Sequence, residues 1–120
     1  IGKAGSLKAP VPLDAFADQV KAAFGLPFLL MYGSDAVKEP VSRVAVSPGA
    51  GGSMIRYALE KKVQVLVTGD AAASGMAILD AGHYGLEHIF IPFMADYIRN
   101  VSGSTLEVLQ AAPDFPARVI

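Results

Sequence analysis

The feature that most constrains the fold is the mostly β-branched run Val63–Val67, which is followed by Thr68-Gly69-Asp70. A short apolar run of this composition is typical of a strand that is buried on both faces of a sheet in α/β proteins. A second apolar run, Gly75–Leu79, begins after only the small residues Ala71–Ser74. Because a parallel crossover needs about a dozen residues or more, the sequence predicts either that these strands are not parallel or that residues are missing between them.

The rest of the chain alternates between helical and strand patterns. Apolar residues of Leu13–Phe24 recur at steps of three and four, which predicts a helix that ends at Gly25. The patterns predict further strands at Phe28–Tyr32, Val41–Ser47 and Thr105–Leu109, and further helices at Met54–Lys62 and Leu86–Asn100. The predicted fold class is therefore α/β, with a mixed sheet flanked by helices.

Glycine and proline mark two places where a regular pattern is expected to fail. Ile1–Pro12 is predicted to be an extended lead-in rather than a regular element. Pro92 lies inside the last predicted helix. Because proline lacks the N–H that a helical hydrogen bond needs, it predicts a kink, or a helix that is regular only after this residue.

Composition limits the class of protein. The 120 residues fit one domain, 1–120, and 52% hydrophobic with 18% charged residues is enough for a core. A net charge of -1 without a basic block argues against nucleic-acid binding through phosphates. The absence of cysteine excludes disulfides and thiol catalysis. The sequence has neither an apolar run of the ~18 residues that a membrane span needs nor a signal peptide, so we expect a cytoplasmic protein.

A glycine-rich loop joins a predicted strand to a predicted helix. Such a loop can present backbone N–H groups to an anion, and the candidate anion-binding residues here are Gly49, Gly51, Gly52 and Ser53. The loop lacks both the G-x-G-x-x-G order and a G-K-[ST] ending. The alternative is that the glycines allow a tight turn and close packing of helix on strand, with Ser53 as the helix N-cap.

The stretch Asp80–Glu87 carries the main candidate site. His83 and Glu87 are four residues apart, so on a helix they would share one face. An imidazole and a carboxylate placed in this way can bind a transition metal, or they can form a structural hydrogen bond. Asp80 and Asp70 are candidates to orient the imidazole from outside the ligand set. Asp70 could equally cap or organise the end of its strand.

Three stretches together resemble one family. Arg43–Ser53 is similar to the family's strand and small-residue loop, and Val65–Asp70 is similar to its next strand with a T-G-D motif. Asp80–Tyr84 with Glu87 resembles its D-A-G-H-Y-x-x-E motif, which is the specific one. The family is the Nif-three-like group of GTP cyclohydrolase I type 2 homologues. The resemblance runs from about Gly2 to Gln110 in the family's order.

The resemblance implies a dinuclear metal centre in a toroidal homohexamer, with His83 and Glu87 as metal ligands. The family's other ligands, a pair of adjacent histidines and an aspartate, belong to an N-terminal half. The only other histidine in this chain is His88, so the chain looks like the C-terminal half of a Nif-three-like protein. The missing N-terminal half would be needed to complete the site. On a helix His88 would point about 100° away from Glu87, which suits a supporting or surface role.

The ligand types and the family resemblance also lead to expectations about the metal, the length of the chain and its function. Mixed nitrogen and oxygen ligands suit two ions of zinc, manganese, iron or nickel. Family members usually carry a longer segment after the T-G-D motif, so roughly eight to ten residues are expected to be missing between Asp70 and Ala73, and a real deletion is the alternative. The first function is a metal-dependent hydrolase of an unknown small, nucleotide-like substrate. The alternatives are a non-enzymatic metal-binding oligomeric scaffold or regulatory protein, and an anion- or nucleotide-binding module that uses Gly49–Ser53.

Overall fold

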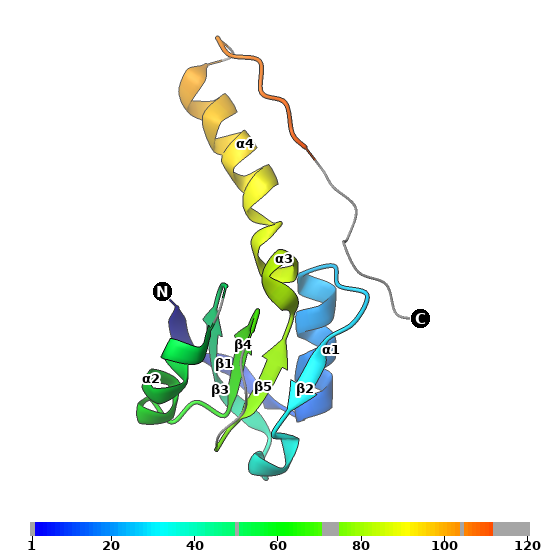
Figure 1. Cartoon of the computed structure of the whole chain (residues 1–120), viewed down its shortest axis with the longest axis vertical. Coiled ribbons are helices and arrows are strands. Elements are labelled where there is room, and N and C mark those ends of the chain that lie inside the picture. The colour runs from blue at the N-terminus through cyan, green and yellow to red at the C-terminus, as the bar shows by residue number, and fades with distance from the viewer. Residues whose placement is uncertain (1, 50, 71–74, 104, 112–120) are drawn as a thin grey trace.

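The computed structural model of the chain describes residues 2–49, 51–70, 75–103 and 105–111. In these ranges the chain forms a mixed sheet with the strand order β1-β3-β4-β5-β2 (Figure 1). β3, β4 and β5 run parallel, and the antiparallel strands β1 and β2 form the two edges. The predicted α/β class with a mixed sheet is confirmed. The strands are β1 (Lys3–Val11), β2 (Leu30–Tyr32), β3 (Val41–Ser47), β4 (Val65–Thr68) and β5 (Ala77–Asp80).

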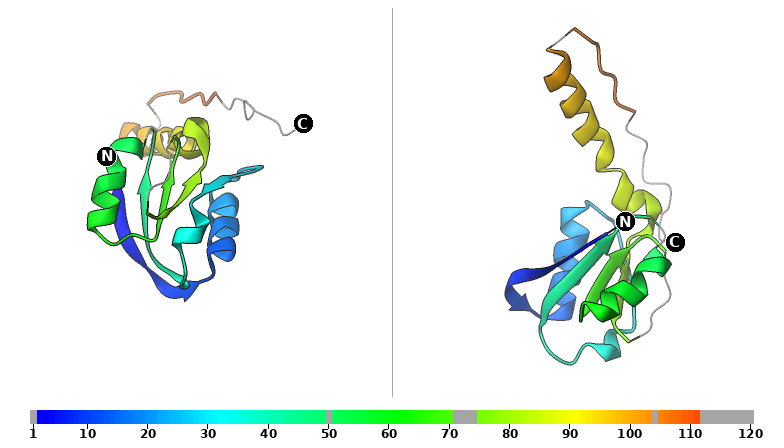
Figure 2. Two further views of the ribbon diagram at one scale, coloured as in Figure 1. Left: turned by 60° about the horizontal axis from the view of Figure 1, so that its bottom comes forward. Right: turned by 90° about the vertical axis from the view of Figure 1, so that its left-hand side faces the viewer.

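Helices cover both faces of the sheet, as Figure 2 shows. On one face, α1 (Leu13–Ala23) buries Phe16 in a core cluster with Val65. On the other face, α2 (Ile55–Glu60) buries Ala58 in a second cluster with Leu66. Successive residues of β4 thus enter different cores, and both Val65 and Leu66 are fully buried. This two-sided burial explains why the β4 sequence is continuously apolar rather than alternating.

The N-terminal segment differs from its prediction. The prediction of an irregular lead-in at Ile1–Pro12 is wrong over the described residues, because Lys3–Val11 forms β1 and pairs antiparallel with β3. Gly5 and Pro10 weaken the strand pattern in the sequence. Both residue types are tolerated at the edge of a sheet, where one side of the backbone needs no partner strand.

β4 and β5 are parallel neighbours, with Val65 paired to Ala77 and Thr68 paired to Asp80. The predicted alternative that the two strands are not parallel is therefore wrong. Missing residues were also predicted between Asp70 and Ala73, and that stretch lies outside the described residues apart from Asp70 itself.

The predicted helix Leu86–Asn100 is two helices, α3 (Gly82–Glu87) and α4 (Phe90–Ser102). Pro92 therefore lies in the first turn of α4, where a backbone N–H has no helical partner in any case. α4 ends at Gly103, which adopts a left-handed conformation with φ 55°. Figure 1 shows α4 extending away from the sheet.

The C-terminal described segment is not a strand. The predicted strand Thr105–Leu109 is wrong, since residues 105–111 contain no strand. β1 and β2 form the two edges of the sheet, and the described residues 105–111 pair with neither of them. None of the helices in the described ranges combines the length and apolar character that crossing a membrane requires.

Candidate metal centre

The two predicted ligands meet above one glycine. His83 and Glu87 lie one turn apart on α3, and both are exposed. A Cβ atom built on Gly49 would lie 3.3 Å from Nε2 of His83 and 3.3 Å from Oε1 of Glu87. The imidazole nitrogen and the carboxylate oxygen therefore face the same small volume. That volume is open because Gly49 has no side chain.

The loop that carries Gly49 is tied to the end of β4. Gly49 follows β3 by two residues and has φ +69°, a conformation that favours glycine. Its carbonyl oxygen accepts hydrogen bonds from Thr68 Oγ1 at 3.1 Å and from the Gly69 N–H at 3.0 Å. The Thr68-Gly69 pair of the T-G-D motif thus holds the loop beneath the two candidate ligands.

α3 begins directly beside the end of β4, where Thr68 and Gly69 hold the Gly49 loop. The Ala81 N–H donates to the Thr68 carbonyl at 2.8 Å, which joins the ends of β5 and β4. Asp80 Oδ1 accepts the Gly82 N–H at 2.9 Å and so fixes the first turn of α3. Gly82, the first residue of α3, has φ +67°, so the chain turns sharply where the helix starts.

The structure places Asp80 and Asp70 next to the site in different ways. Asp80 is half-buried, and its carboxylate supports the backbone of the turn that carries His83. The Asp70 side chain is exposed, and its carbonyl oxygen accepts the Gly51 N–H at 3.1 Å. A direct role of either carboxylate in orienting the imidazole stays a prediction.

The glycine loop has a clear packing role. A Cβ atom on Gly51 would lie 2.0 Å from Oγ1 of Thr68, so only glycine fits against the end of β4 there. The Gly51 N–H is already bonded to the Asp70 carbonyl.

Gly52 and Ser53 are exposed, and Ser53 lies within the short 3-10 helix Gly51–Met54. The N-cap of α2 is Met54, so the prediction of Ser53 as N-cap is wrong. Anion binding by Gly49, Gly51, Gly52 and Ser53 stays a prediction.

His88 is engaged with Tyr84. The two rings stack with centroids 5.3 Å apart, and His88 Nδ1 lies 3.1 Å from the Tyr84 carbonyl oxygen. Because a carbonyl oxygen only accepts, the neutral imidazole of His88 carries its proton on Nδ1. His88 thus contacts Tyr84 of α3, and its supporting or surface role stays a prediction.

The donor set fits a divalent metal in part. A neutral imidazole nitrogen and a carboxylate oxygen are ligands that zinc, manganese, iron and nickel accept. The cradle over Gly49 offers two such donors, whereas a catalytic zinc site usually has three from protein. In the described ranges no group of three His, Cys, Asp or Glu side chains lies close enough to hold an ion. A site with three or more protein donors would therefore need donors from outside these residues.

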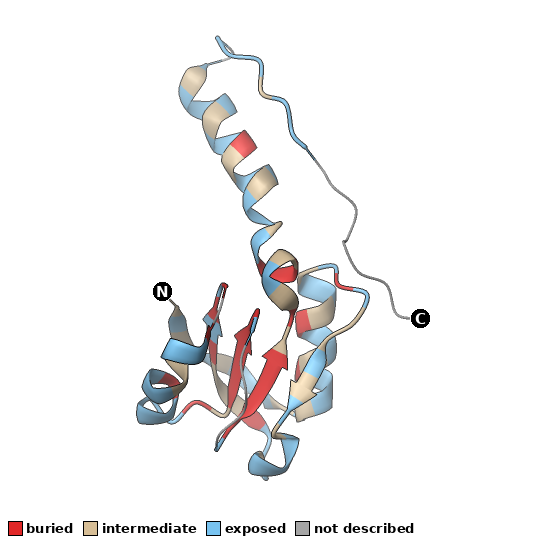
Figure 3. Ribbon diagram, in the orientation of Figure 1, coloured by how far each residue is buried: buried red, intermediate tan, exposed pale blue. Residues whose placement is uncertain are grey.

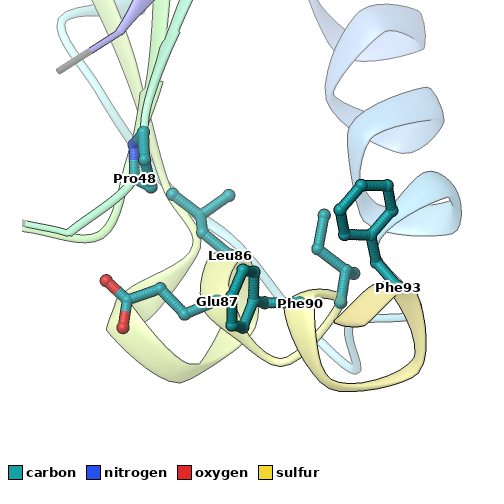
Figure 4. Close-up of a pocket in the computed structure, with 6 residues that line it drawn as sticks. Pro48, Leu86, Glu87, Phe90 and Phe93 are labelled. Carbon is teal, nitrogen blue, oxygen red and sulfur yellow. The ribbon is translucent and has the colours of Figure 1, made fainter. Parts of the chain in front are cut away.

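Glu87 also lines a pocket of about 700 Å³ that the sequence did not reveal. Figure 4 shows Leu86 directed toward Pro48, and the Glu87 carboxylate on the side away from Phe93. Ile89 and Phe90 complete an otherwise apolar wall. A pocket of this size with one charged group at its border is typical of a ligand-binding or docking site.

Known proteins are similar to this chain in both sequence and fold. The profile of the family described as Duf34/NIF3 (NGG1p interacting factor 3) matches residues 1–114. A Lactococcus lactis protein named GTP cyclohydrolase 1 type 2 homolog is 33% identical over 109 residues, which are 83% of this chain and 42% of the relative. A Mycobacterium leprae protein of the same name is 36% identical over 120 residues, which are 90% of this chain and 30% of that relative.

Solved structures agree with the family match. A Bacillus cereus protein related to NIF3 superposes with a TM-score of 0.83 at 26% identity, over 100% of this chain and 35% of its own. A Staphylococcus aureus hypothetical protein superposes with a TM-score of 0.77 at 20% identity, over 100% of this chain and 43% of its own, which shows a shared fold.

The fold and site define an α/β protein with a histidine–glutamate pair at the carboxyl edge of a parallel sheet core. The chain belongs to the Duf34/NIF3 family. It spans less than half the length of the curated relatives just described, in agreement with the prediction of a partial, C-terminal match.

Proposed function

We propose that the chain contributes His83 and Glu87 to a divalent-metal site of a NIF3 protein that acts as a metal-dependent hydrolase on a small, nucleotide-like substrate. The observation that carries this proposal is the convergence of His83 Nε2 and Glu87 Oε1 over Gly49. The name of the curated relatives, GTP cyclohydrolase 1 type 2 homolog, supports a nucleotide-like substrate.

The residues of the chain have distinct parts in this proposal. His83 would hold an ion through Nε2 and Glu87 through a carboxylate oxygen, while the bare Cα of Gly49 leaves room for it. Asp80 keeps the first turn of α3 in place through the Gly82 N–H. When bound, such an ion activates a water molecule and polarises a carbonyl or phosphoryl oxygen. Zinc, manganese, iron and nickel remain the candidates, with two ions per site by resemblance.

The rest of the site and its assembly are part of the proposal. The N-terminal half of a NIF3 protein would supply the remaining donors, since this chain covers 42% of the Lactococcus lactis relative. A toroidal homohexamer in the cytoplasm is the assembly and location that the family resemblance supports.

Metal content tests the ligand pair. We expect elemental analysis to find zinc or manganese retained by the complete NIF3 protein after dialysis, and His83→Ala or Glu87→Gln in that protein to lower metal affinity at least about 10-fold. His88→Ala is the matched control, because His88 is bonded to Tyr84 rather than facing Gly49. Equal metal binding by wild type and His83→Ala would exclude the pair as ligands.

Hydrolysis tests the activity. In the complete NIF3 protein we expect GTP hydrolysis that requires added metal and disappears in His83→Ala with the assembly intact. Activity that survives this substitution would reject the hydrolase proposal. Metal binding without hydrolysis of any nucleotide would instead favour the scaffold alternative.

The third function, an anion- or nucleotide-binding module, has less support. One of its four candidate residues already uses its N–H group within the protein, because Gly51 donates to Asp70. Nucleotide affinity that persists in chelator would revive this function, and its absence would remove it.

A further inference from the structure

A lysine of β1 lies at the edge of the sheet that carries the candidate metal centre. Lys3 is the first residue of β1 and pairs with Val46, near the carboxyl end of β3. Because β1 runs antiparallel to β3, its first residue lies at the same end of the sheet as the start of α3 (Figure 1). Lys8 and Arg43 are the other basic residues of the described strands, and both lie nearer the opposite end.

Lys3 borders a pocket that adjoins the one to which Glu87 contributes. The Lys3 pocket has a volume of about 280 Å³ and is lined by Gly2, Lys3, Val46 and Pro48. Its volume is close to the lower end of the range of about 300–1,000 Å³ that is typical of small-molecule sites. Pro48 also lines the larger pocket that contains Glu87, so the two pockets share a wall.

The backbone beside Lys3 is held closely against β3. A Cβ atom on Gly2 would lie 2.8 Å from the Val46 carbonyl oxygen and 3.3 Å from Cε of Met54. Figure 3 shows β4 and β5 as mainly buried, whereas the chain next to the N-terminus is intermediate or exposed. Packing and strand pairing thus position the backbone of Lys3, while its side chain is exposed and accessible to a ligand.

The charge of Lys3 is available for an anion. The ion pairs of the described ranges join other residues, on α1, α2 and α4. The carboxylates nearest the candidate metal centre have contacts of their own, since Asp80 accepts the Gly82 N–H and Glu87 faces Gly49. Phosphate oxygens form strong, charge-assisted hydrogen bonds with an ammonium group. A lysine between the apolar side chains of Val46 and Pro48 is therefore suited to a phosphate group.

The separation between Lys3 and the ligand pair fits a substrate of nucleotide size. Paired residues on neighbouring strands are about 5 Å apart, and the three residues from Val46 to Gly49 span at most about 11 Å. The flexible four-carbon stem of lysine lets its ammonium group cover part of this separation. A small phosphorylated molecule can thus extend from Lys3 to the volume over Gly49.

We propose that Lys3 binds the phosphate group of a phosphorylated small substrate, whose reacting part lies at His83 and Glu87. This inference rests on the proposed function and adds the charged group by which that site would select its substrate. The metal pair acts on the reacting atoms, whereas Lys3 contributes binding and orientation at a distance from them. Lys3 is thus a specificity-determining residue, and it differs from the glycine-rich loop because it binds through a side-chain charge.

Isothermal titration calorimetry of the complete NIF3 protein with GMP, guanosine and inorganic phosphate tests the site. We expect Lys3→Met to weaken GMP binding at least about 10-fold and to leave guanosine binding within about 2-fold of wild type. Lys3→Arg keeps the charge and should retain most of the GMP affinity. Lys8→Met is the matched control, because it removes an exposed lysine from the same strand, away from the pocket. Circular dichroism checks the fold, and Lys3→Gln replaces Lys3→Met if that variant does not fold.

The contrary results are distinct. A wild-type protein that does not bind GMP would overturn the proposal, and so would equal GMP affinity in wild type and Lys3→Met. An equal loss in Lys3→Met and Lys8→Met would overturn it in favour of general charge attraction. Inorganic phosphate that binds as tightly as GMP would overturn the assignment to a substrate and leave a site for the free ion.

A second set of titrations separates this inference from the metal proposal. The loss of GMP affinity on Lys3→Met should also appear in the His83→Ala background, because the phosphate contact does not involve the imidazole. If His83→Ala leaves metal content unchanged while the Lys3→Met effect persists, the metal proposal fails and the phosphate site stands. If the Lys3→Met effect is absent while His83→Ala loses metal, the phosphate site alone fails.

Discussion

Gly69 packs against the backbone of His83: a Cβ atom on Gly69 would lie 2.9 Å from the His83 backbone nitrogen and 3.0 Å from its Cα. The neighbouring atoms belong to the main chain of α3, so they cannot rotate aside as a flexible side chain would. The glycine of the T-G-D motif therefore sets how closely the histidine helix approaches the sheet.

Gly69→Ala should displace the start of α3. We expect a loss of about 1–3 kcal/mol in the free energy of unfolding, because the added methyl group overpacks a backbone contact. Metal affinity should fall at least about 10-fold, since the His83 imidazole moves with the helix. Urea unfolding and metal titration measure the two effects. Gly5→Ala, at a position with nothing within 4 Å of its Cβ, should leave metal affinity unchanged.

Gly49→Ala should test the volume beneath the ligand pair. The new methyl group would lie 3.3 Å from both His83 Nε2 and Glu87 Oε1, so it competes with any bound ion. The φ angle of +69° adds a cost of about 1–2 kcal/mol for alanine. We expect metal binding to be lost in a titration, whereas Gly52→Ala, whose Cβ has open space, should bind as wild type does. Unchanged affinity in Gly49→Ala would place the ion elsewhere.

Gly51→Ala should be destabilising for a different reason. Its Cβ would overlap Thr68 Oγ1, the donor that holds the Gly49 carbonyl. We expect a loss of about 1–3 kcal/mol in the free energy of unfolding. A double-mutant cycle with Thr68→Ser, which keeps the hydroxyl but removes the methyl group, should show coupling, because the methyl carbon lies 3.2 Å from the new Cβ. Additive effects would show that the clash is relieved by movement of the loop instead.

Two substitutions of Asp80 distinguish its support of the turn before His83 from any role in orienting the His83 imidazole. Asp80→Ala removes the acceptor of the Gly82 N–H and should cost about 1 kcal/mol of stability. Asp80→Asn keeps a carbonyl oxygen for that bond, so its urea midpoint should stay near wild type. If the carboxylate also orients His83, Asp80→Asn alone should lower metal affinity 10- to 100-fold. Wild-type affinity in Asp80→Asn would restrict Asp80 to the turn.

The central elements could be predicted because local pattern and final environment agree in them. Val41–Ser47 forms β3 as predicted, and the apolar run at Val63–Val67 becomes the fully buried β4. β1 could not be predicted, because its Gly and Pro residues are unfavourable in isolation and its stability comes from pairing with β3. Thr105–Leu109 shows the opposite error, since alternation of apolar residues makes a strand only where the segment pairs with another strand, and the described residues 105–111 form no strand.

The site was predictable in part for the same reason. The spacing of His83 and Glu87 fixes their common side of α3, and this local relationship holds in the structure. The role of Gly49 depends on contacts with residues more than thirty positions away, which no local pattern reveals. The pattern predicted the helix that contains Phe90, Phe93 and Tyr97 but not that these residues are exposed, because periodicity says which residues share a side and not what covers them.

The edge position of β2 has a consequence for how the chain folds as it is synthesised. Leu30 of β2 pairs with Asp80 of β5, and β5 is the strand beside which β2 lies. A ribosome that adds about 5–20 residues per second needs roughly 2–10 s to reach β5 after β2 has been made. During that interval β1, α1 and β3 can already assemble, while β2 waits without its strand partner. β5, the last strand of the described sheet to be made, is thus the one with which the early strand β2 pairs.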